Sequence, residues 1–422
     1  MTESSQEKTG ESAKRLRICL LTGSFYPVVG GGERHAHLLC RELSRQGSEV
    51  LVLTRRRTRD LPRCEAMDGF TVIRVGPSGF PRLGKYLMLA PALWRLWRRR
   101  RQYDLIYVCG LRVLGLAGVL AQILVGKPCV LRAESRGELS GEFIWKSPEG
   151  QIKPMLRAFF SPLIAIRNRL LMRATCFLSI STPIREEFLA AGVSPAHIAD
   201  IPNGFDVATF SPGAPEDRPA LRQKLGLPAA ILYAYSGKLN RGKGLERFLR
   251  VWERFAANHP EVHLILIGSG RGQHLSCEQA LWTFVREHNL EASITFTGYV
   301  DVVQDYLHAT DIFVFPSESE AQGLSVLEAL ACKVPVIASR IPGIMDMVTD
   351  GVNGRLVEVR DEDAWLKALA DFIEKPEYFR HLAEAGYNTV QNHFSMAATS
   401  AKHLAVFWQL MPSRKEGAMQ AD

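Results

Sequence analysis

The chain has 422 residues, 46% of them hydrophobic, which is enough for a large apolar core and predicts two or three domains. Its eight cysteines stand singly, which excludes a metal or redox motif built on cysteine spacing and favours reduced core thiols. The net charge of +8 is uneven, because residues 1–200 carry 31 Lys and Arg against 17 Asp and Glu, whereas the remainder carries 21 against 27.

The first half predicts a sheet preceded by a polar, disordered tail at 1–15. Short apolar runs that read as strands lie at 16–22, 49–54, 70–75, 105–109, 128–133 and 176–181. Helical patterns alternate with them, and this alternation is typical of parallel sheets covered by helices on both faces.

Three glycines, Gly30, Gly31 and Gly32, precede the first predicted helix. Glycines at that place let a phosphate or an acceptor approach the backbone amides. A dinucleotide-binding loop fits poorly, because Phe25–Val29 separates the strand from the glycines, whereas the dinucleotide fingerprint turns directly off its strand.

Two basic and apolar segments follow, at 81–104 and 152–174. Neither has the roughly 20 uninterrupted apolar residues that span a bilayer. Trp94, Trp97 and the run Arg98–Arg101 instead resemble a helix that docks on anionic lipid. The alternative is an ordinary helix that covers a sheet and keeps a solvated outer face. Nucleic acid is a third possibility for a basic stripe, but no base-reading module accompanies it.

Pro, Gly and Asp accumulate around 203–230, which predicts a boundary between a domain at 16–204 and a second at 205–391. Strand-like runs in the second half lie at 231–239, 262–267, 293–299, 311–316 and 335–339. We expect the last helix, near 392–411, to cross back to the first domain.

Glu320 and Glu328 flank the point where the strand at 311–316 gives way to a helix. Ligands of open α/β sheets lie at the carboxyl ends of strands. Ionised carboxylates there are poor partners for phosphate but good acceptors for hydroxyl groups. Gly323 between them leaves the backbone free to approach a ligand. The alternative is that both are solvated charges favoured by the helix dipole.

The surrounding string, PSESEAQGLSVLEALACKVPVIASRIPGIMDMVTDGVNGRLV, resembles the donor-sugar signature of retaining, nucleotide-sugar-dependent glycosyltransferases of the GT-B fold, family 4. Lys333 replaces the usual Gly before Val334, and Asp346 comes three residues after Gly343. The resemblance implies two Rossmann-like domains that face a central cleft. It extends to YAYSGKL with RGKG after it, and to the glycine-rich opening segment.

In that family, lysines at the positions of Lys238 and Lys243 bind the donor diphosphate, an acid at the position of Glu320 the sugar, and one at the position of Glu328 the ribose. Fixed cations can stabilise a leaving diphosphate without a metal. The resemblance therefore implies neither a cofactor nor a metal. The full set of expected donor-binding residues is Gly30, Gly31, Gly32, Gly237, Lys238, Lys243, Gly268, Glu320, Gln322, Gly323, Leu324, Ser325 and Glu328.

Many family members place a His after the strand that corresponds to 128–133, and this chain has Glu134 there. We expect Glu134, with Glu320, Lys243 and Lys238, to serve catalysis, unless Glu134 only pairs with Arg132 or Arg136. His35 and His37 are further candidates, although lone histidines more often have structural roles.

The resemblance implies transfer of a sugar from a UDP- or GDP-sugar to a saccharide or lipid-linked acceptor, in the cytoplasm or at the cytoplasmic face of a membrane. A nucleotide-sugar epimerase of the same architecture and a catalytically silent binding protein remain alternatives.

Overall fold

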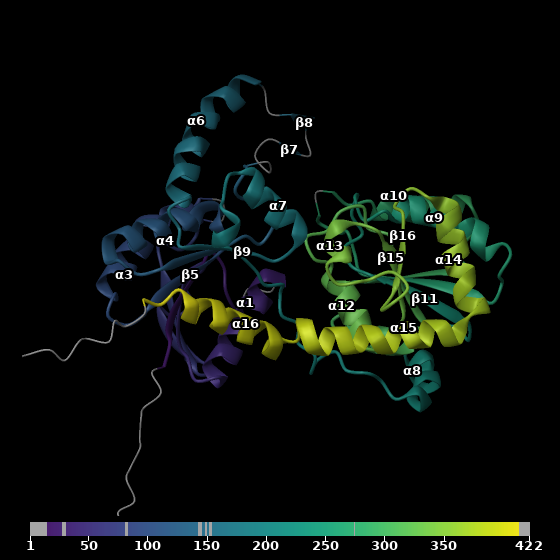
Figure 1. Cartoon of the computed structure of the whole chain (residues 1–422). Coiled ribbons are helices and arrows are strands. Elements are labelled where there is room, and N and C mark those ends of the chain that lie inside the picture. Colours follow the sequence, from purple (N-terminus) through teal and green to yellow (C-terminus); the bar gives the residue numbers. More distant parts are fainter. Residues whose placement is uncertain are drawn as a thin grey trace, which may run out of the picture. The chain divides into compact units, whose positions relative to one another are not determined.

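The computed structural model describes residues 15–27, 31–80, 83–141, 146–147, 150–151, 154–273 and 275–412. Within them strands and helices alternate along the chain (Figure 1). Packing divides the chain into two compact units. One consists of Met1–Leu131, Arg173–Thr175 and Leu404–Asp422, and the other of Arg132–Met172 and Cys176–His403.

The strands form two main sheets and a short hairpin. The first sheet contains β1 (Arg17–Thr22), β2 (Glu49–Arg55), β3 (Cys64–Met67), β4 (Phe70–Val75), β5 (Leu105–Cys109), β6 (Cys129–Arg132), β9 (Cys176–Ser179) and β10 (Ile198–Asp200). The second contains β11 (Ile231–Ser236), β12 (Val262–Ile267), β13 (Ile294–Gly298), β14 (Ile312–Phe315), β15 (Val336–Ser339) and β16 (Arg355–Val357). The hairpin pairs β7 (Lys146–Ser147) with β8 (Gly150–Gln151).

Helices connect these strands. Up to β11 they are α1 (Gly31–Arg45), α2 (Gly84–Leu87), α3 (Leu89–Arg98), α4 (Leu111–Val125), α6 (Pro154–Leu171), α7 (Thr182–Ala190), the short turns η1 (Pro195–His197) and η2 (Pro215–Asp217), and α8 (Arg218–Lys224). After β11 they are α9 (Leu245–Ala256), α10 (Glu278–Glu287), α11 (Val303–Ala309), α12 (Leu324–Ala331), α13 (Pro342–Met345), α14 (Glu362–Glu374), α15 (Pro376–Thr389), the π turn η3 (Val390–Phe394) and α16 (Met396–Gln409).

Both main sheets are built from parallel strands, which confirms the predicted α/β class with two Rossmann-like domains. The first has the order β10-β9-β6-β5-β1-β2-β4-β3, with β3 antiparallel to β4. The second has the order β13-β12-β11-β14-β15-β16 and is parallel throughout its pairings. The change of sheet between β10 and β11 falls near the boundary predicted at 204, although the compact units divide elsewhere.

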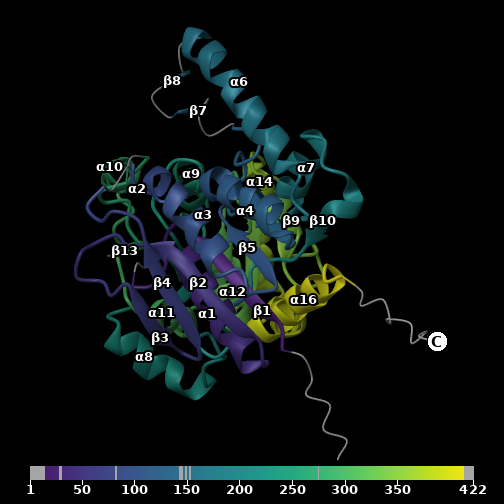
Figure 2. The same ribbon diagram turned by 90° about the vertical axis from the view of Figure 1, so that its left-hand side faces the viewer.

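The apolar runs become strand cores because both faces of a parallel sheet are covered. In the first sheet α4 packs on β5, and α3 packs on α4 (Figure 2). In the second, Tyr233 of β11 is fully buried against Trp252 and Phe255 of α9, and its hydroxyl donates to the Leu369 carbonyl at 2.9 Å. The expectation of core thiols fails at one cysteine, since Cys64 on β3 is exposed.

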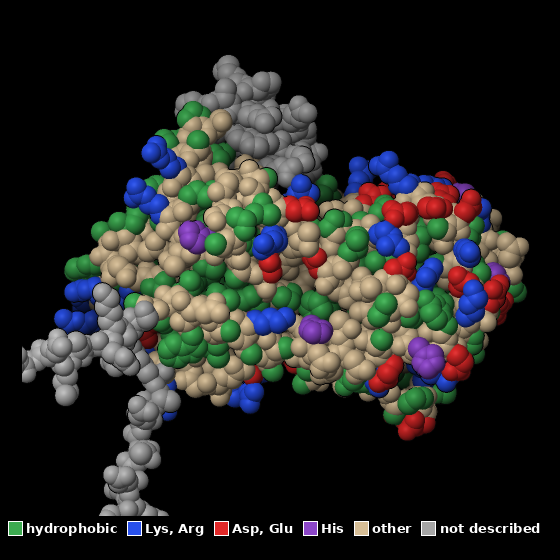
Figure 3. All heavy atoms as spheres, in the orientation of Figure 1, with side chains coloured by type: hydrophobic (Ala, Val, Ile, Leu, Met, Phe, Trp, Pro, Cys, Tyr) green, Lys and Arg blue, Asp and Glu red, His purple; other side chains and the backbone are tan. Residues whose placement is uncertain are grey.

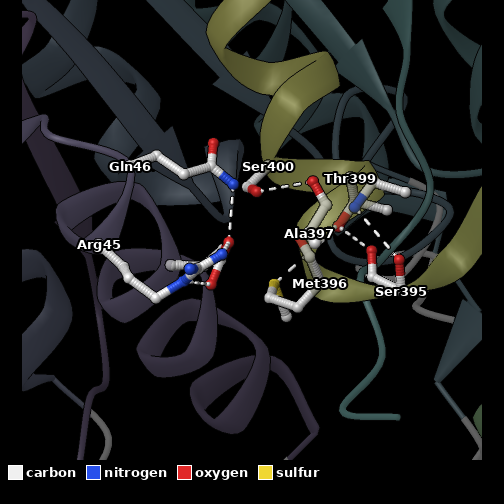
Figure 4. A network of polar contacts seen from close by, with 9 residues as sticks. Arg45, Gln46, Ser395, Met396, Ala397, Thr399 and Ser400 are labelled. Atoms are coloured by element: carbon white, nitrogen blue, oxygen red, sulfur yellow. Dashed lines mark hydrogen bonds and ion pairs between the residues drawn. The ribbon is translucent and has the colours of Figure 1, made fainter.

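α16 buries polar residues by pairing them with its own backbone. The Thr399 hydroxyl donates to the Ser395 carbonyl at 3.1 Å, and the Ser400 hydroxyl donates to the Ala397 carbonyl at 3.0 Å (Figure 4). Such bonds let Ser and Thr be buried on a helix without an unpaired donor. Towards the helix end, Phe407 packs against Tyr107 of β5 at a ring distance of 5.3 Å.

The buried His403 of α16 should make the folded protein measurably less stable in acid. Burial lowers the pKa of His403 to about 4, and the charge of Arg132 acts in the same direction. The unfolded chain therefore binds more protons between about pH 6.5 and 4, so stability falls as the pH drops through that range. We expect His403 to account for about 3 kcal/mol of the loss in unfolding free energy from pH 7 to 4.

Urea unfolding at several pH values measures this effect. His403→Gln should flatten the pH dependence, whereas the exposed His393→Gln should keep it. Identical pH slopes in the wild type and His403→Gln would show that this histidine does not couple folding to protonation.

Candidate functional site

The strand order of the second sheet marks a ligand-binding edge. From β11 the chain moves to one side for β12 and β13, and then returns to the other side for β14, β15 and β16. β11 and β14 are thus neighbouring strands, and the connections that follow them run to opposite sides of the sheet. In open α/β sheets the crevice at such a switch point binds the ligand. The loops at 237–244 and 316–323 follow β11 and β14 at this switch point.

An ion pair joins these two loops. The Lys243 Nζ lies 2.5 Å from the Glu320 Oε1, and the Ser317 hydroxyl donates to the same oxygen at 2.8 Å. Both side chains are largely shielded, with 25% of Lys243 and 13% of Glu320 exposed. The Glu318 amide also donates to the Gly242 carbonyl at 2.9 Å. The fold therefore brings together two predicted catalytic residues that lie 77 positions apart.

The ion pair leaves hydrogen-bonding capacity unused on both partners. A lysine ammonium carries three donors, and a carboxylate has several acceptor positions. Glu320 thus holds the Lys243 ammonium beside the switch point while keeping acceptor positions of its own. A ligand with an anionic group and neighbouring hydroxyl groups would match this arrangement.

The predicted glycines of this edge act through close packing of neighbouring loops. Gly237 follows β11 and Gly268 follows β12. A Cβ on Gly268 would lie 2.0 Å from the Gly237 carbonyl oxygen, so only glycine permits this approach. Lys238, next to Gly237, has an exposed side chain, and its carbonyl accepts a hydrogen bond from the buried Tyr235 hydroxyl at 3.1 Å.

α12 begins at the crevice. Gly323 caps it with a left-handed backbone at φ 68°, and Leu324 and Ser325 form its first turn. Amide N–H groups in a first helical turn have no partner within the helix and favour anions. Glu328 stands one turn further on and is half-buried. The predicted strand-to-helix junction is therefore present with all four residues in the expected elements.

Gln322 is turned towards the connection between the sheets. Only 3% of it is exposed. Its Oε1 accepts from the Asn203 amide at 2.9 Å, and its Nε2 donates to the Asn203 carbonyl at 3.3 Å. The side chain is thus engaged by protein backbone, which leaves the main chain of Gln322 as the part that could meet a ligand.

The glycine-rich segment after β1 is described in part. Gly30 lies outside the described residues, whereas Gly31 and Gly32 open α1. On the same helix His37 bonds to Asp68 at 2.8 Å and stacks on Tyr26 at a ring distance of 5.4 Å. His35 is buried. The burial of His35 and the aromatic and polar neighbours of His37 agree with structural roles for these histidines.

Glu134 is exposed at the end of β6, with its Oε1 3.8 Å from the Nη1 of the buried Arg132. The pairing with Arg132 that the sequence left open is thus present. Arg132 in turn bonds to the Asn203 side chain.

Sequence reasoning missed two carboxylates that hold the loop carrying Glu134. Glu138 Oε1 accepts from the amides of Glu134 and Ser135 at 3.0 and 3.1 Å. The buried Glu187 of α7 accepts from the amides of Gly137, Leu139 and Ser140 at 2.6 to 2.9 Å. Buried carboxylates need such donors. No local sequence pattern predicts this role of Glu187, because its hydrogen-bond partners lie 47 to 50 positions away.

Two parallel sheets with helical connections give the chain the GT-B fold, and charged loops lie at the switch point of the second sheet. Two family profiles match: "Glycosyl transferase 4-like domain" at residues 30–204, and "Glycosyl transferases group 1" at 217–389. Together they cover most of the chain, which belongs to the group 1 glycosyl transferases.

Individual relatives agree with this assignment. D-inositol 3-phosphate glycosyltransferase 2 of Catenulispora acidiphila is 31% identical over 51% of this chain, which spans about half (51%) of that relative. Glycogen synthase of Mycobacterium tuberculosis is 28% identical over 93% of this chain and 94% of its own length. Among solved structures, HepE of Anabaena superposes with a TM-score of 0.72 at 20% identity, over 93% of this chain and all (100%) of HepE.

Proposed function

We propose that the protein transfers a sugar from a nucleoside-diphosphate sugar to a hydroxyl group of a saccharide or lipid-linked acceptor. The observation that carries this proposal is the Lys243–Glu320 ion pair at the switch point of the second sheet. It sets a cation and a hydroxyl-accepting carboxylate side by side, which is what a sugar diphosphate requires.

In this proposal, different residues of the site bind different parts of the nucleotide sugar. Lys243 and Lys238 bind the diphosphate, and Glu320 with the backbone of Gln322–Leu324 binds the sugar. Glu328 accepts hydrogen bonds from the ribose hydroxyls. UDP is the first nucleotide to test, because HepE has been crystallised with UDP and with UDP-glucose. GDP is the alternative.

In the proposed reaction, lysine ammonium groups stabilise the negative charge of the leaving diphosphate. The bond between the anomeric carbon and the diphosphate oxygen breaks as the acceptor oxygen bonds to the same carbon. The acceptor hydroxyl loses its proton to the leaving phosphate, which gains negative charge. Fixed ammonium groups stabilise that charge where it develops, so we propose a mechanism without a metal or a further cofactor. Attack from the face that the diphosphate leaves would retain the anomeric configuration.

We propose that Glu134 orients the acceptor hydroxyl by accepting a hydrogen bond from it, while the proton passes to the leaving phosphate. It is exposed on a loop that Glu138 and Glu187 hold in place, and such support is a requirement of a precise catalytic group. Glu134→Gln should lower turnover by about 100-fold and change the pH profile of turnover. Glu186→Gln is a matched control, because Glu186 is the direct neighbour of Glu187 on α7. Normal turnover with an unchanged pH profile in Glu134→Gln would remove this role.

A transfer assay with purified protein and a panel of UDP- and GDP-sugars tests the function. The proposal predicts release of the nucleoside diphosphate and a saccharide or glycolipid product, both detected by mass spectrometry. An isomerised free nucleotide sugar in the absence of acceptor would indicate an epimerase. Donor binding without hydrolysis or transfer across a broad acceptor panel would indicate a silent binding protein.

The place of the reaction is also a proposal. A lipid-linked acceptor would be reached at an anionic membrane surface, and the first compact unit carries a surface suited to it.

A further inference from the structure

The outer surface of α3 and α4 exposes an unusual amount of apolar side chain. Trp94 and Trp97 of α3 are 50% and 47% exposed, and Ile123 and Leu124 near the end of α4 are 49% and 61% exposed. Leu87 of α2 and Leu120 of α4 extend this surface. We call these six residues the α3–α4 face. α3 packs on both α2 and α4, so the helices that carry the six residues are direct neighbours.

The same segment is strongly cationic. Residues 83–127 contain eight Lys or Arg and one acidic residue, Asp104, which gives a charge of +7. Asp104 is already paired with Arg17 at 2.6 Å. In the space-filling view, Lys and Arg side chains lie beside hydrophobic ones over the region of α3 and α4 (Figure 3).

The cations stack on the exposed tryptophans. The guanidinium carbons of Arg95 and Arg98 lie 5.0 and 5.6 Å from the ring centre of Trp94, and that of Arg100 lies 5.0 Å from the ring of Trp97. Tryptophan rings favour the boundary between water and lipid tails, and arginine favours the phosphate groups at that depth. Each stacked pair therefore offers both interactions in one place.

We infer that the α3–α4 face docks on the surface of an anionic lipid bilayer. An apolar area rimmed by cations matches an interface that is apolar below and anionic above. Among the helices of the described ranges, none is long and apolar enough to cross a bilayer. An apolar and cationic helix surface of this kind supports docking on the membrane surface.

A second copy of the chain is a poorer occupant. In a two-fold dimer the face would meet itself, which would bring together two copies of the segment 83–127, each with a charge of +7. Nucleic acid would satisfy the charge, but the aliphatic side chains of Leu120, Ile123 and Leu124 provide neither base stacking nor hydrogen bonds. Charge and apolar character together favour lipid.

The docking is a property of the first unit and does not depend on the donor site. It deepens the proposed function in one respect, because it favours a lipid-linked acceptor over a free saccharide. The binding test below uses no nucleotide and measures no transfer, so its failure would leave the proposed activity standing.

Flotation of the full chain with liposomes tests the inference. Vesicles of phosphatidylglycerol and phosphatidylcholine in equal parts should retain the protein at low salt, and vesicles of phosphatidylcholine alone should retain much less. Salt near 1 M, where the screening length is about 3 Å, should release most of the bound protein.

Variants separate the apolar contribution to membrane binding from the electrostatic one. The double variant Trp94→Ala, Trp97→Ala should lower partitioning by at least about tenfold, and Arg98→Gln, Arg100→Gln should lower it by about fivefold for each charge. Trp408→Ala is the matched aromatic control, because Trp408 is 45% exposed elsewhere on the same unit. Arg250→Gln, Arg286→Gln is the charge control, since both residues lie on helices of the second unit. The controls should bind as the wild type does.

Four results would overturn the inference. The first is the absence of flotation at every lipid composition, and the second is equal flotation of all variants. The third is sedimentation of the wild type as a concentration-dependent dimer that Trp94→Ala, Trp97→Ala converts to a monomer, which would assign the face to a second copy. Binding to a nucleic acid duplex without binding to vesicles would count against lipid in the same way.

Discussion

Lys243→Ala should lower the rate of sugar transfer by about 100- to 1,000-fold while the protein stays folded. The leaving diphosphate gains negative charge in the transition state, and the ammonium of Lys243 is fixed at the switch-point crevice by Glu320. Without that cation, only water and Lys238 would stabilise the developing negative charge. The steady-state rate with saturating donor and the far-ultraviolet circular dichroism spectrum together measure the effect.

Lys224→Ala is the control for Lys243→Ala. Lys224 is 71% exposed on α8 and makes a longer ion pair, at 3.4 Å with Asp305. Its replacement should leave turnover within about twofold of the wild type, as expected for a surface charge. Near-normal turnover in Lys243→Ala would contradict the assignment of the diphosphate to this lysine.

Glu320→Gln should lower turnover by about 100-fold, because the change removes both an acceptor for the donor sugar and the charge that positions Lys243. The amide keeps the size of the side chain and leaves Ser317 a partner, so the loss of stability should be small. The measurement is the Michaelis–Menten analysis of transfer at several donor concentrations.

Two comparisons sharpen that measurement. Glu318→Gln changes an exposed carboxylate in the same loop, 42% exposed and 3.5 Å from Arg247, and should have little effect. The double variant Lys243→Ala, Glu320→Gln should lose less than the sum of the single losses in activation free energy, because the two residues act as one unit. Simple additivity would mean that the ion pair has no part in transfer.

The long parallel strands were predictable, whereas the short strands at sheet edges were not. Every apolar run singled out in the sequence lies in a strand within a few residues of its predicted ends, because a strand covered on both faces must be apolar. β3, β10 and β16 were missed, and so were the two-residue strands β7 and β8 of the hairpin. β3 is only half covered, and β10 and β16 have three residues each, too few to establish a period.

The candidate site was predictable in its residues but not in its contacts. Glu320, Lys238 and Lys243 could be placed at strand ends from their positions, because parallel strands end at one edge of a sheet. That β14 lies beside β11, and so brings Glu320 to Lys243, depends on a strand order that the sequence does not state. Glu187 shows the same limit, since its three backbone partners come from a distant loop.

A crystal structure of the protein with UDP or GDP bound is the most direct test of the donor site. The account predicts the diphosphate within hydrogen-bond reach of the Lys243 and Lys238 ammonium groups, and the ribose hydroxyls on Glu328. A diphosphate bound instead at the start of α1, with Lys243 still paired only to Glu320, would contradict it.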